Sequence, residues 1–230
     1  MSLPIHQPYE NGKGGVEIGL KPIENIAWLE LDDLFAKEIE LKKKLYKEKR
    51  NQVLMTPPDS ISLQQEVLEL VLDHLKTFHG NTYNLDKKKI ENIESRDVFH
   101  FKDFANPIEL ASMLVQEDLI VMKPTKKTFS LESASLCAPT RWSLREKFGQ
   151  TLSQIHSGVP GYKEKIDSRV IKIFTNLPDE KIFERFNWSI FDSPELFQPA
   201  QSKSLVEIKN LDPKNLYLRV ERQTIRRLHK

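Results

Sequence analysis

The sequence has 230 residues, a formal charge of +2, and 39% hydrophobic and 30% charged residues. Its length suits one large domain or two small ones with a real core, and a charge so close to zero does not favour nucleic-acid binding. No apolar run approaches the ~20 residues of a membrane-spanning helix, and the N-terminus lacks a signal-peptide pattern. The single cysteine, Cys137, excludes an intrachain disulfide and cysteine-based metal cages. We therefore expect a cytoplasmic protein without membrane or nucleic-acid partners.

The first part of the chain differs in composition from the rest. Residues 1–30 are rich in proline, glycine and asparagine, so we expect an extended N-terminal arm with Ile26, Trp28 and Leu29 as its anchors. The remaining residues, 31–230, are expected to form one domain.

Two helices are expected next. The first runs from about residue 32 to 50, with apolar residues at helical spacing. The second runs from about residue 60 to 78 and is expected to be capped by Asp59, Ser60 or Ser62, of which Ser62 fits a capping box with Gln65. Its buried face is predicted to comprise Val67, Leu68, Val71, Leu75 and Phe78.

The second half of the chain reads as a short helix followed by strands. The proline of Asn106-Pro107 is typical of a helix start. Further elements are expected as strands at about 117–122, 129–139, 182–190 and 216–225 and as a helix at 163–177. Phe186 and Trp188 share a strand face and are expected in the core. Helices that precede a largely antiparallel sheet indicate the α+β class.

The connection from Thr140 to Tyr162 is the most informative stretch. His156 there is followed by Ser157-Gly158-Val159-Pro160, which must leave helical geometry at once. A neutral imidazole held at such a helix end is able to ligate a haem iron, with its second nitrogen bonded to an acceptor. The alternative, a structural histidine bonded to the backbone, is favoured by the residues alone.

The last expected strand carries several arginines. Strand alternation places Arg219 and Arg222 on opposite faces. An inward-facing arginine needs an anionic partner, and a haem propionate suits a bidentate guanidinium. An intramolecular pair with Glu221, Glu207 or Glu184 is the alternative that the residues alone favour.

Two further groups of polar residues are candidates for a site. Glu117 and Asp118 lie at a helix-to-strand junction and face opposite sides, so one of them is able to orient a cationic amine or accept a proton. Alternatively, the pair terminates the helix. Asn187 and Arg185 lie on the strand face opposite Phe186 and Trp188, and they either reach a ligand or form hydrogen bonds on the sheet surface.

Several blocks of the chain together resemble the haem-dependent oxidative N-demethylase alpha-subunit-like family, formerly catalogued as a domain of unknown function. The similar blocks occur in the same order and spacing. They are Gln116–Leu119, Pro139 with Trp142–Leu144 and Glu146–Gly149, Ile155-His156 with Val159-Pro160, Arg185–Trp188, and Leu218–Thr224 with Arg227-Leu228. The likeness covers most of the chain and is weak before Asp103.

The resemblance implies a PAS-like antiparallel sheet with flanking helices that holds a b-type haem. It implies oxidative removal of a methyl group from a small methylated amine as formaldehyde, with dioxygen activated and with electrons from NADPH through a separate reductase that carries flavin. By the same resemblance His156 is the matching histidine and the expected axial iron ligand. For such a reaction we expect the catalytic acid to be Glu117 or Asp118, whichever faces the pocket, and the haem to be bound by His156, Arg219, Arg222, Arg226, Trp142 and Asn187.

Two departures from the family pattern bear on this expectation. His229 stands where the family has a proline, and the chain stops at Lys230, where the family continues into a further strand and helix. We therefore expect those C-terminal elements to be missing. The alternatives are a haem- or ligand-binding sensor without turnover and a scaffold protein that has lost the cofactor.

Overall fold

The computed structural model describes residues 6–11, 18–159, 161–200 and 210–229. The helices are α1 (Phe35–Val53), α2 (Ile61–Phe78), α3 (Pro107–Met113), α4 (Leu144–Lys147), α5 (Leu152–Ile155), α6 (Tyr162–Lys165) and α7 (Asp167–Thr175). The strands are β1 (Lys21–Ile23), β2 (Leu54–Met55), β3 (Tyr83–Leu85), β4 (Lys89–Asn92), β5 (Val98–His100), β6 (Leu119–Pro124), β7 (Phe129–Ser135), β8 (Ile182–Phe191) and β9 (Tyr217–Arg226).

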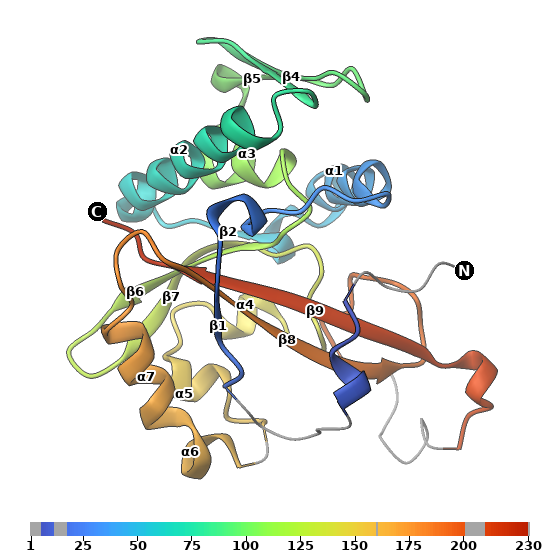
Figure 1. Cartoon of the computed structure of the whole chain (residues 1–230), viewed down its shortest axis with the longest axis vertical. Helices are drawn as coiled ribbons and strands as arrows, with labels where there is room; N and C mark the ends of the chain where they lie inside the picture. Colours follow the sequence, from blue (N-terminus) through green and yellow to red (C-terminus); the bar gives the residue numbers. More distant parts are fainter. Residues whose placement is uncertain (1–5, 12–17, 160, 201–209, 230) are drawn as a thin grey trace.

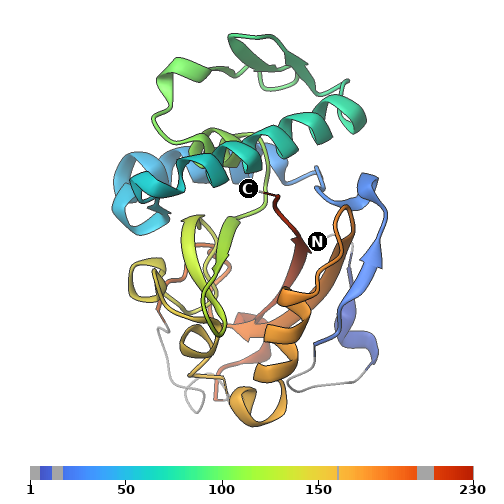
Figure 2. The same cartoon turned by 90° about the vertical axis from the view of Figure 1, so that its left-hand side faces the viewer.

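The strands form three antiparallel sheets of three strands each, in the orders β1-β8-β9, β2-β7-β6 and β3-β4-β5. In Figure 1 the helices α1, α2 and α3 form a layer above the first two sheets, and the small β3-β4-β5 sheet lies beyond that layer. The view in Figure 2 shows β6-β7 and β8-β9 as two walls beneath the helical layer, with α6 and α7 at their lower end. The α+β class expected from the sequence is confirmed.

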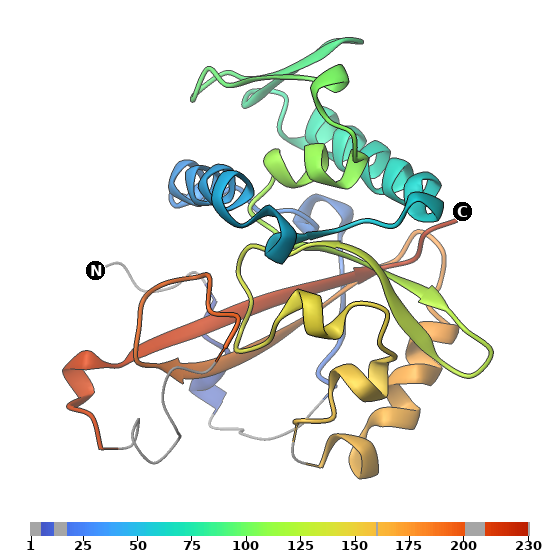
Figure 3. The same cartoon turned by 180° about the vertical axis from the view of Figure 1, so that it is seen from behind.

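The main core lies between the helical layer and the sheets. It includes Leu68, Val71 and Leu75 of α2, as the helical spacing predicted, whereas Val67 and Phe78 are only half-buried, and of these two Val67 packs against the core. A smaller core beneath β7 contains Leu131, Ala134, Leu136 and Leu144, and Trp142 and Ile155 pack against it. Seen from behind, α4 and α5 lie beside β7 (Figure 3), so this small core anchors the stretch that leads to His156.

The two long helices end near their expected positions, and Ser60, one of the three expected caps of α2, is at its N-cap position, whereas the predicted capping box is wrong. The residue before α2 is Ser60, whose hydroxyl accepts a 2.8 Å hydrogen bond from the Gln64 amide and donates one to the Pro57 carbonyl. Ser62 is therefore already inside the helix and does not form a capping box with Gln65. The proline pair before Asp59 starts a short 3-10 turn, Pro58–Ser60, which moves the cap upstream.

The helix expected at 163–177 is two helices, α6 and α7. Ile166 lies between them with φ −133° and ψ −15°, outside the helical region. Its side chain and that of Tyr162 are both buried, and the break at Ile166 lets the chain change direction between them. Figure 1 shows the change of axis from α6 to α7.

Two predicted core positions, Ile26 and Trp188, are exposed. Ile26 is 61% exposed, while the other two expected anchors, Trp28 and Leu29, are buried. Trp188 is 37% exposed, because it lies on the face of β8 opposite the buried Phe191.

The strand β6 begins at Leu119 rather than at residue 117, since the carboxylates of Glu117 and Asp118 bind other segments. The strands β3, β4 and β5 were not expected. Among the described residues no helix is long and apolar enough to span a membrane.

Candidate functional site

The inner face of the β8-β9 pair carries a row of polar side chains. Its cross-strand pairs are Arg185 with Gln223, Asn187 with Glu221, and Ser189 with Arg219, and Phe191, which is 1% exposed, lies on the same face. We call Arg185, Asn187, Arg219 and Glu221 the inner-face residues. Because cross-strand partners point to the same side of a sheet, the register brings these two arginines, one carboxylate and one amide together.

His156 lies at the C-terminal end of α5, as the sequence predicted. Its Nδ1 is 2.8 Å from the Leu152 carbonyl oxygen, and because that oxygen only accepts, Nδ1 carries the proton. Burial lowers the pKa of His156 against the opposing effect of this hydrogen bond, and the charge of Arg185 lowers it further. The imidazole is therefore neutral, and its Nε2 has a lone pair and no hydrogen-bond partner among the described residues.

A capping box holds the helix that presents His156. The Thr151 hydroxyl accepts a hydrogen bond from the Gln154 N–H, and the Gln154 side chain accepts one from the Thr151 N–H at 2.9 Å. The ring of Tyr162, at the start of α6, stacks on the imidazole with 4.3 Å between centroids and 9° between planes. The capping box thus fixes the start of α5 and the Tyr162 ring packs on one face of the imidazole, which together orient His156.

Arg185 lies close enough to His156 and Tyr162 to affect the pKa of each. Its Nη2 donates a 2.6 Å hydrogen bond to the Asn187 side-chain oxygen. Its Nε and the Tyr162 hydroxyl are both buried without a hydrogen-bond partner in the described part of the chain. The sequence left two roles open for Arg185, contact with a ligand or a hydrogen bond on the sheet surface, and its shared strand face with Asn187 was the available signal.

Arg219 belongs to the inner face but its guanidinium is already bound by the protein. It donates to the carbonyl oxygens of Ala138, Pro139 and Leu196, the last at 3.0 Å, and Glu221 lies 3.7 Å away. Its side chain is only 12% exposed. The sequence predicted a propionate or an intramolecular partner for Arg219, and the structure shows the intramolecular one.

Arg222 lies on the other face of β9, as strand alternation predicted. It forms a 3.0 Å ion pair with Glu184 and donates to the carbonyl oxygens of Trp28 and Ala27. Arg226 shares that face, and its guanidinium lies 4.4 Å from the centroid of the Trp28 ring. Both arginines therefore contact the N-terminal segment rather than the side of the sheet that carries Arg185. Glu207, another predicted partner, lies outside the described residues.

The two predicted catalytic acids point to opposite sides, as expected for neighbours at a strand start. Asp118 accepts hydrogen bonds from the backbone N–H groups of Cys137 at 2.7 Å and Ala138 at 2.8 Å. Glu117 accepts one from the N–H of Glu30 at 2.9 Å, and its second oxygen is buried without a partner among the described residues. Burial raises the pKa of both carboxyl groups.

The structure thus brings together His156 and Asn187 of the predicted haem-binding residues, with Arg219 and Asp118 along the same inner side. It separates Arg222, Arg226 and Glu117, which lie on the side of the N-terminal segment. Trp142 packs on the small core beneath β7. Among the described residues no group of three or more histidine, cysteine, aspartate or glutamate side chains is able to hold a metal ion.

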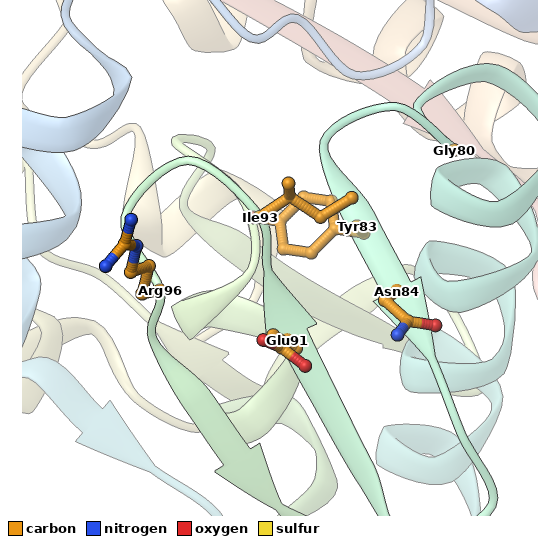
Figure 4. Close-up of a pocket in the computed structure, with 6 residues that line it drawn as sticks. All are labelled: Gly80, Tyr83, Asn84, Glu91, Ile93 and Arg96. Atoms are coloured by element: carbon orange, nitrogen blue, oxygen red, sulfur yellow. The ribbon is translucent and has the colours of Figure 1, made fainter.

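A depression of about 400 Å³ lies elsewhere, in the β3-β4-β5 sheet (Figure 4). It is lined by Gly80, Tyr83, Asn84, Glu91, Ile93 and Arg96. None of the residues predicted from the sequence lines it, and the Tyr83 hydroxyl is already bound to the Leu114 carbonyl. We therefore place the candidate site at His156 and the inner-face residues.

Comparison with protein families agrees with the motifs from which the site was built. Residues 19–230 match the family described as haem-dependent oxidative N-demethylase, alpha subunit-like. The matched region spans the helical layer, both walls of strands and every residue of the candidate site. The chain belongs to the haem-dependent oxidative N-demethylase, alpha subunit-like family.

Proposed function

We propose that this chain binds a b-type haem in a PAS-like domain through His156 and removes a methyl group from a small amine. One observation carries the proposal. The Leu152 carbonyl fixes the proton of His156 on Nδ1, which leaves Nε2 as a lone-pair donor. One neutral histidine is a common protein ligand of haem iron, and a second-sphere acceptor of this kind is typical of metal-binding histidines.

The residues around His156 fit such a group. The buried Nε of Arg185 and the Tyr162 hydroxyl have no partners among the described residues, and polar atoms of this kind are normally satisfied by a ligand or by water. When bound, the haem supplies the oxidation with dioxygen, and a separate reductase with flavin and NADPH supplies electrons. The methyl carbon leaves as formaldehyde.

The protein must also hold the amine, which is cationic near neutral pH and needs a negative or aromatic counterpart. The sequence assigned this role to Glu117 or Asp118. Asp118 is on the inner side, but both its oxygens accept backbone hydrogen bonds. Glu221 supports the role better, because it lies on the inner face and its nearest cation, Arg219, is 3.7 Å away.

Formaldehyde release tests the activity. The full chain is loaded with haem and supplied with dimethylamine, dioxygen, NADPH and a flavin reductase. We expect formaldehyde only when all components are present, and Glu221→Gln should raise KM while haem content stays unchanged. Haem binding without formaldehyde from dimethylamine, trimethylamine or N-methylglycine would contradict the proposed activity.

A binding protein without turnover is the second candidate function. The observation in its favour is that Glu117 and Asp118, the acids expected to take part in catalysis, both accept hydrogen bonds from backbone N–H groups. This candidate predicts a haem spectrum that responds to ligands in the absence of formaldehyde release.

A further inference from the structure

The inner face contains one arginine, Arg185, that uses only one of its N–H donors in a hydrogen bond to a described residue. Arg185 forms no ion pair with any described residue, and its one hydrogen bond there goes to the neutral amide of Asn187. Its Nε is buried. Burial lowers the pKa of the Arg185 guanidinium, which is the direction expected for a cation without a close counter-ion.

Arg219 and Arg222 of the same hairpin differ from Arg185 in this respect, whereas Arg226, on the opposite face, also has a buried Nε without a described partner and lies over the Trp28 ring. The Arg219 and Arg222 side chains are also largely buried, with 12% and 11% exposed. Each of them donates to two or more backbone carbonyl oxygens and has a carboxylate nearby. The protein thus satisfies those two guanidinium groups by itself, as a buried charge requires, and leaves Arg185 open.

A second unsatisfied donor lies beside Arg185. The Tyr162 hydroxyl is buried without a partner in the described residues, and each of the two groups changes the pKa of the other. Tyr162 also stacks on His156 at 4.3 Å, so both donors adjoin the imidazole. A buried N–H and a buried O–H that lie next to each other are stable only with a hydrogen-bond acceptor. The positive charge of the guanidinium favours an anionic acceptor.

We propose that Arg185 and Tyr162 bind a carboxylate beside His156, with the guanidinium held in place by Asn187. This inference deepens the proposed function, since it names the group that the site recognises. It also replaces an expectation from the sequence, because the arginine available to an anion is Arg185 rather than Arg219 or Arg222. Two molecules carry the required group: the haem itself, through a propionate, and a methylated amine that is also an amino acid, such as N-methylglycine.

A chemical double-mutant cycle tests the haem propionate. The full chain, Arg185→Gln, Arg185→Lys and Tyr162→Phe are each titrated with haem and with haem dimethyl ester, which has no free carboxylate. A charge-assisted hydrogen bond is worth roughly 1.5–3 kcal/mol, so Arg185→Gln should weaken haem binding about 10-fold to 100-fold. The affinity for the dimethyl ester should stay within about twofold, well below the tenfold step that 1.4 kcal/mol represents.

The second arm uses N-methylglycine and dimethylamine as probes of the same variants. If the carboxylate belongs to the amine, Arg185→Gln weakens N-methylglycine binding and leaves haem affinity unchanged. Arg169→Gln, on the exposed surface of α7, is the matched control and should change none of these affinities. Melting temperature and circular dichroism show that each variant folds, and Arg185→Lys keeps the charge if Arg185→Gln is unstable.

The outcomes separate this inference from the proposed function. A loss specific to haem or to N-methylglycine supports the carboxylate site and identifies its source. Equal affinities of the full chain, Arg185→Gln and Tyr162→Phe for both probes would overturn it, even if the protein binds haem. If the unmodified chain binds no haem, the proposed function fails. The carboxylate site is then tested only by whether the full chain binds N-methylglycine more tightly than Arg185→Gln and Tyr162→Phe do.

Discussion

The side chain of Arg222 connects three segments: its own strand β9, the neighbouring strand β8 and the N-terminal segment. It pairs with Glu184 of β8 and donates to the carbonyl oxygens of Ala27 and Trp28, so it fastens the N-terminal segment to the long hairpin. Breaking a buried pair by removing one partner costs about 3–5 kcal/mol. The low end applies here, because the Glu184 side chain is 21% exposed.

Arg222→Gln should therefore lower the free energy of unfolding by about 3 kcal/mol without changing haem affinity in the folded protein. Urea unfolding and haem titration measure the two quantities, and Arg145→Gln on the exposed side of α4 serves as the control. Normal stability with weaker haem binding would instead establish the propionate role that the sequence suggested for Arg222.

His74 is a buried histidine outside the candidate site. It is 3% exposed, its ring meets that of Trp28 edge-on at 5.4 Å, and neither ring nitrogen has a partner among the described residues. Burial, followed by the charge of His79, lowers the pKa of His74 from 6.5 to about 4. At a pH between these two values, His74 therefore binds a proton in the unfolded chain but remains neutral in the folded chain.

The resulting prediction concerns stability below neutral pH. As pH falls from 6.5 toward 4, unfolding free energy should decrease by up to about 3 kcal/mol from His74. His74→Phe keeps an aromatic ring beside Trp28 and Phe78 and should remove most of this dependence. Urea unfolding at pH 7 and at pH 5 checks it, and an unchanged pH slope in the variant would show that other groups cause the loss.

For single residues, the sequence predicted the strand face or helix end on which a side chain lies better than it predicted the groups to which that side chain is bound. Strand alternation placed Arg219 and Arg222 on opposite faces correctly, and the turn after Ile155 placed His156 at a helix end. Their partners were not predictable, because Ala138 and Trp28 are brought to the arginines by tertiary contacts far along the chain. The open donors of Arg185 were not predictable for the same reason, because only the completed fold shows which inner-face guanidinium lacks a counter-ion among the described residues.

The helix α5 is short, so its cap has a large effect on the orientation of His156. Thr151 and Gln154 form the capping box, and replacement of such a cap by alanine costs about 1 kcal/mol. Thr151→Ala should thus reduce stability by about this amount and also weaken haem binding, since α5 positions the imidazole. Thr175→Ala, at the exposed end of α7, is the control. Unchanged haem affinity in Thr151→Ala would mean that Tyr162 alone orients His156.

The junction between α3 and β6 is the second element with a testable role. Asp118→Asn replaces an oxygen that accepts a backbone N–H by an amide group that donates, and an unpaired buried donor costs about 1–3 kcal/mol. We expect a stability loss of about 2 kcal/mol with no change in KM for the amine. Glu117→Gln keeps an acceptor for the N–H of Glu30 and should cost less.

Thermal unfolding and steady-state kinetics of both variants decide between the two roles. A raised KM with normal stability in Asp118→Asn or Glu117→Gln would establish the catalytic role that the sequence suggested.

Elements with strong periodicity were predicted well, and elements fixed by local turns were not. The stripe of Leu68, Val71 and Leu75 defined α2. The break at Ile166 and the strands β3 to β5 depend on turn geometry, such as the Asn92 side chain that accepts hydrogen bonds from two following N–H groups. Such turns leave no apolar period in the sequence.

For the whole molecule, the order of helices and strands was enough to predict the α+β class. It was not enough to predict that the strands divide into three separate sheets. The pairing of β1 with β8 joins residues near 22 and 183, and no short-range pattern encodes so distant a contact. The inner face therefore becomes visible only when β8, β9 and the stretch from α4 to α6 are assembled (Figures 2 and 3).

The central claim is that His156 binds the haem of this family member, and the absorption spectrum tests it most directly. The full chain, His156→Ala and His100→Ala, a control in β5, are loaded with haem under the same conditions and checked for folding. We predict a Soret band for the full chain and for His100→Ala, and its loss or a strong shift for His156→Ala. Unchanged haem content and an unchanged spectrum in a folded His156→Ala protein would contradict the account.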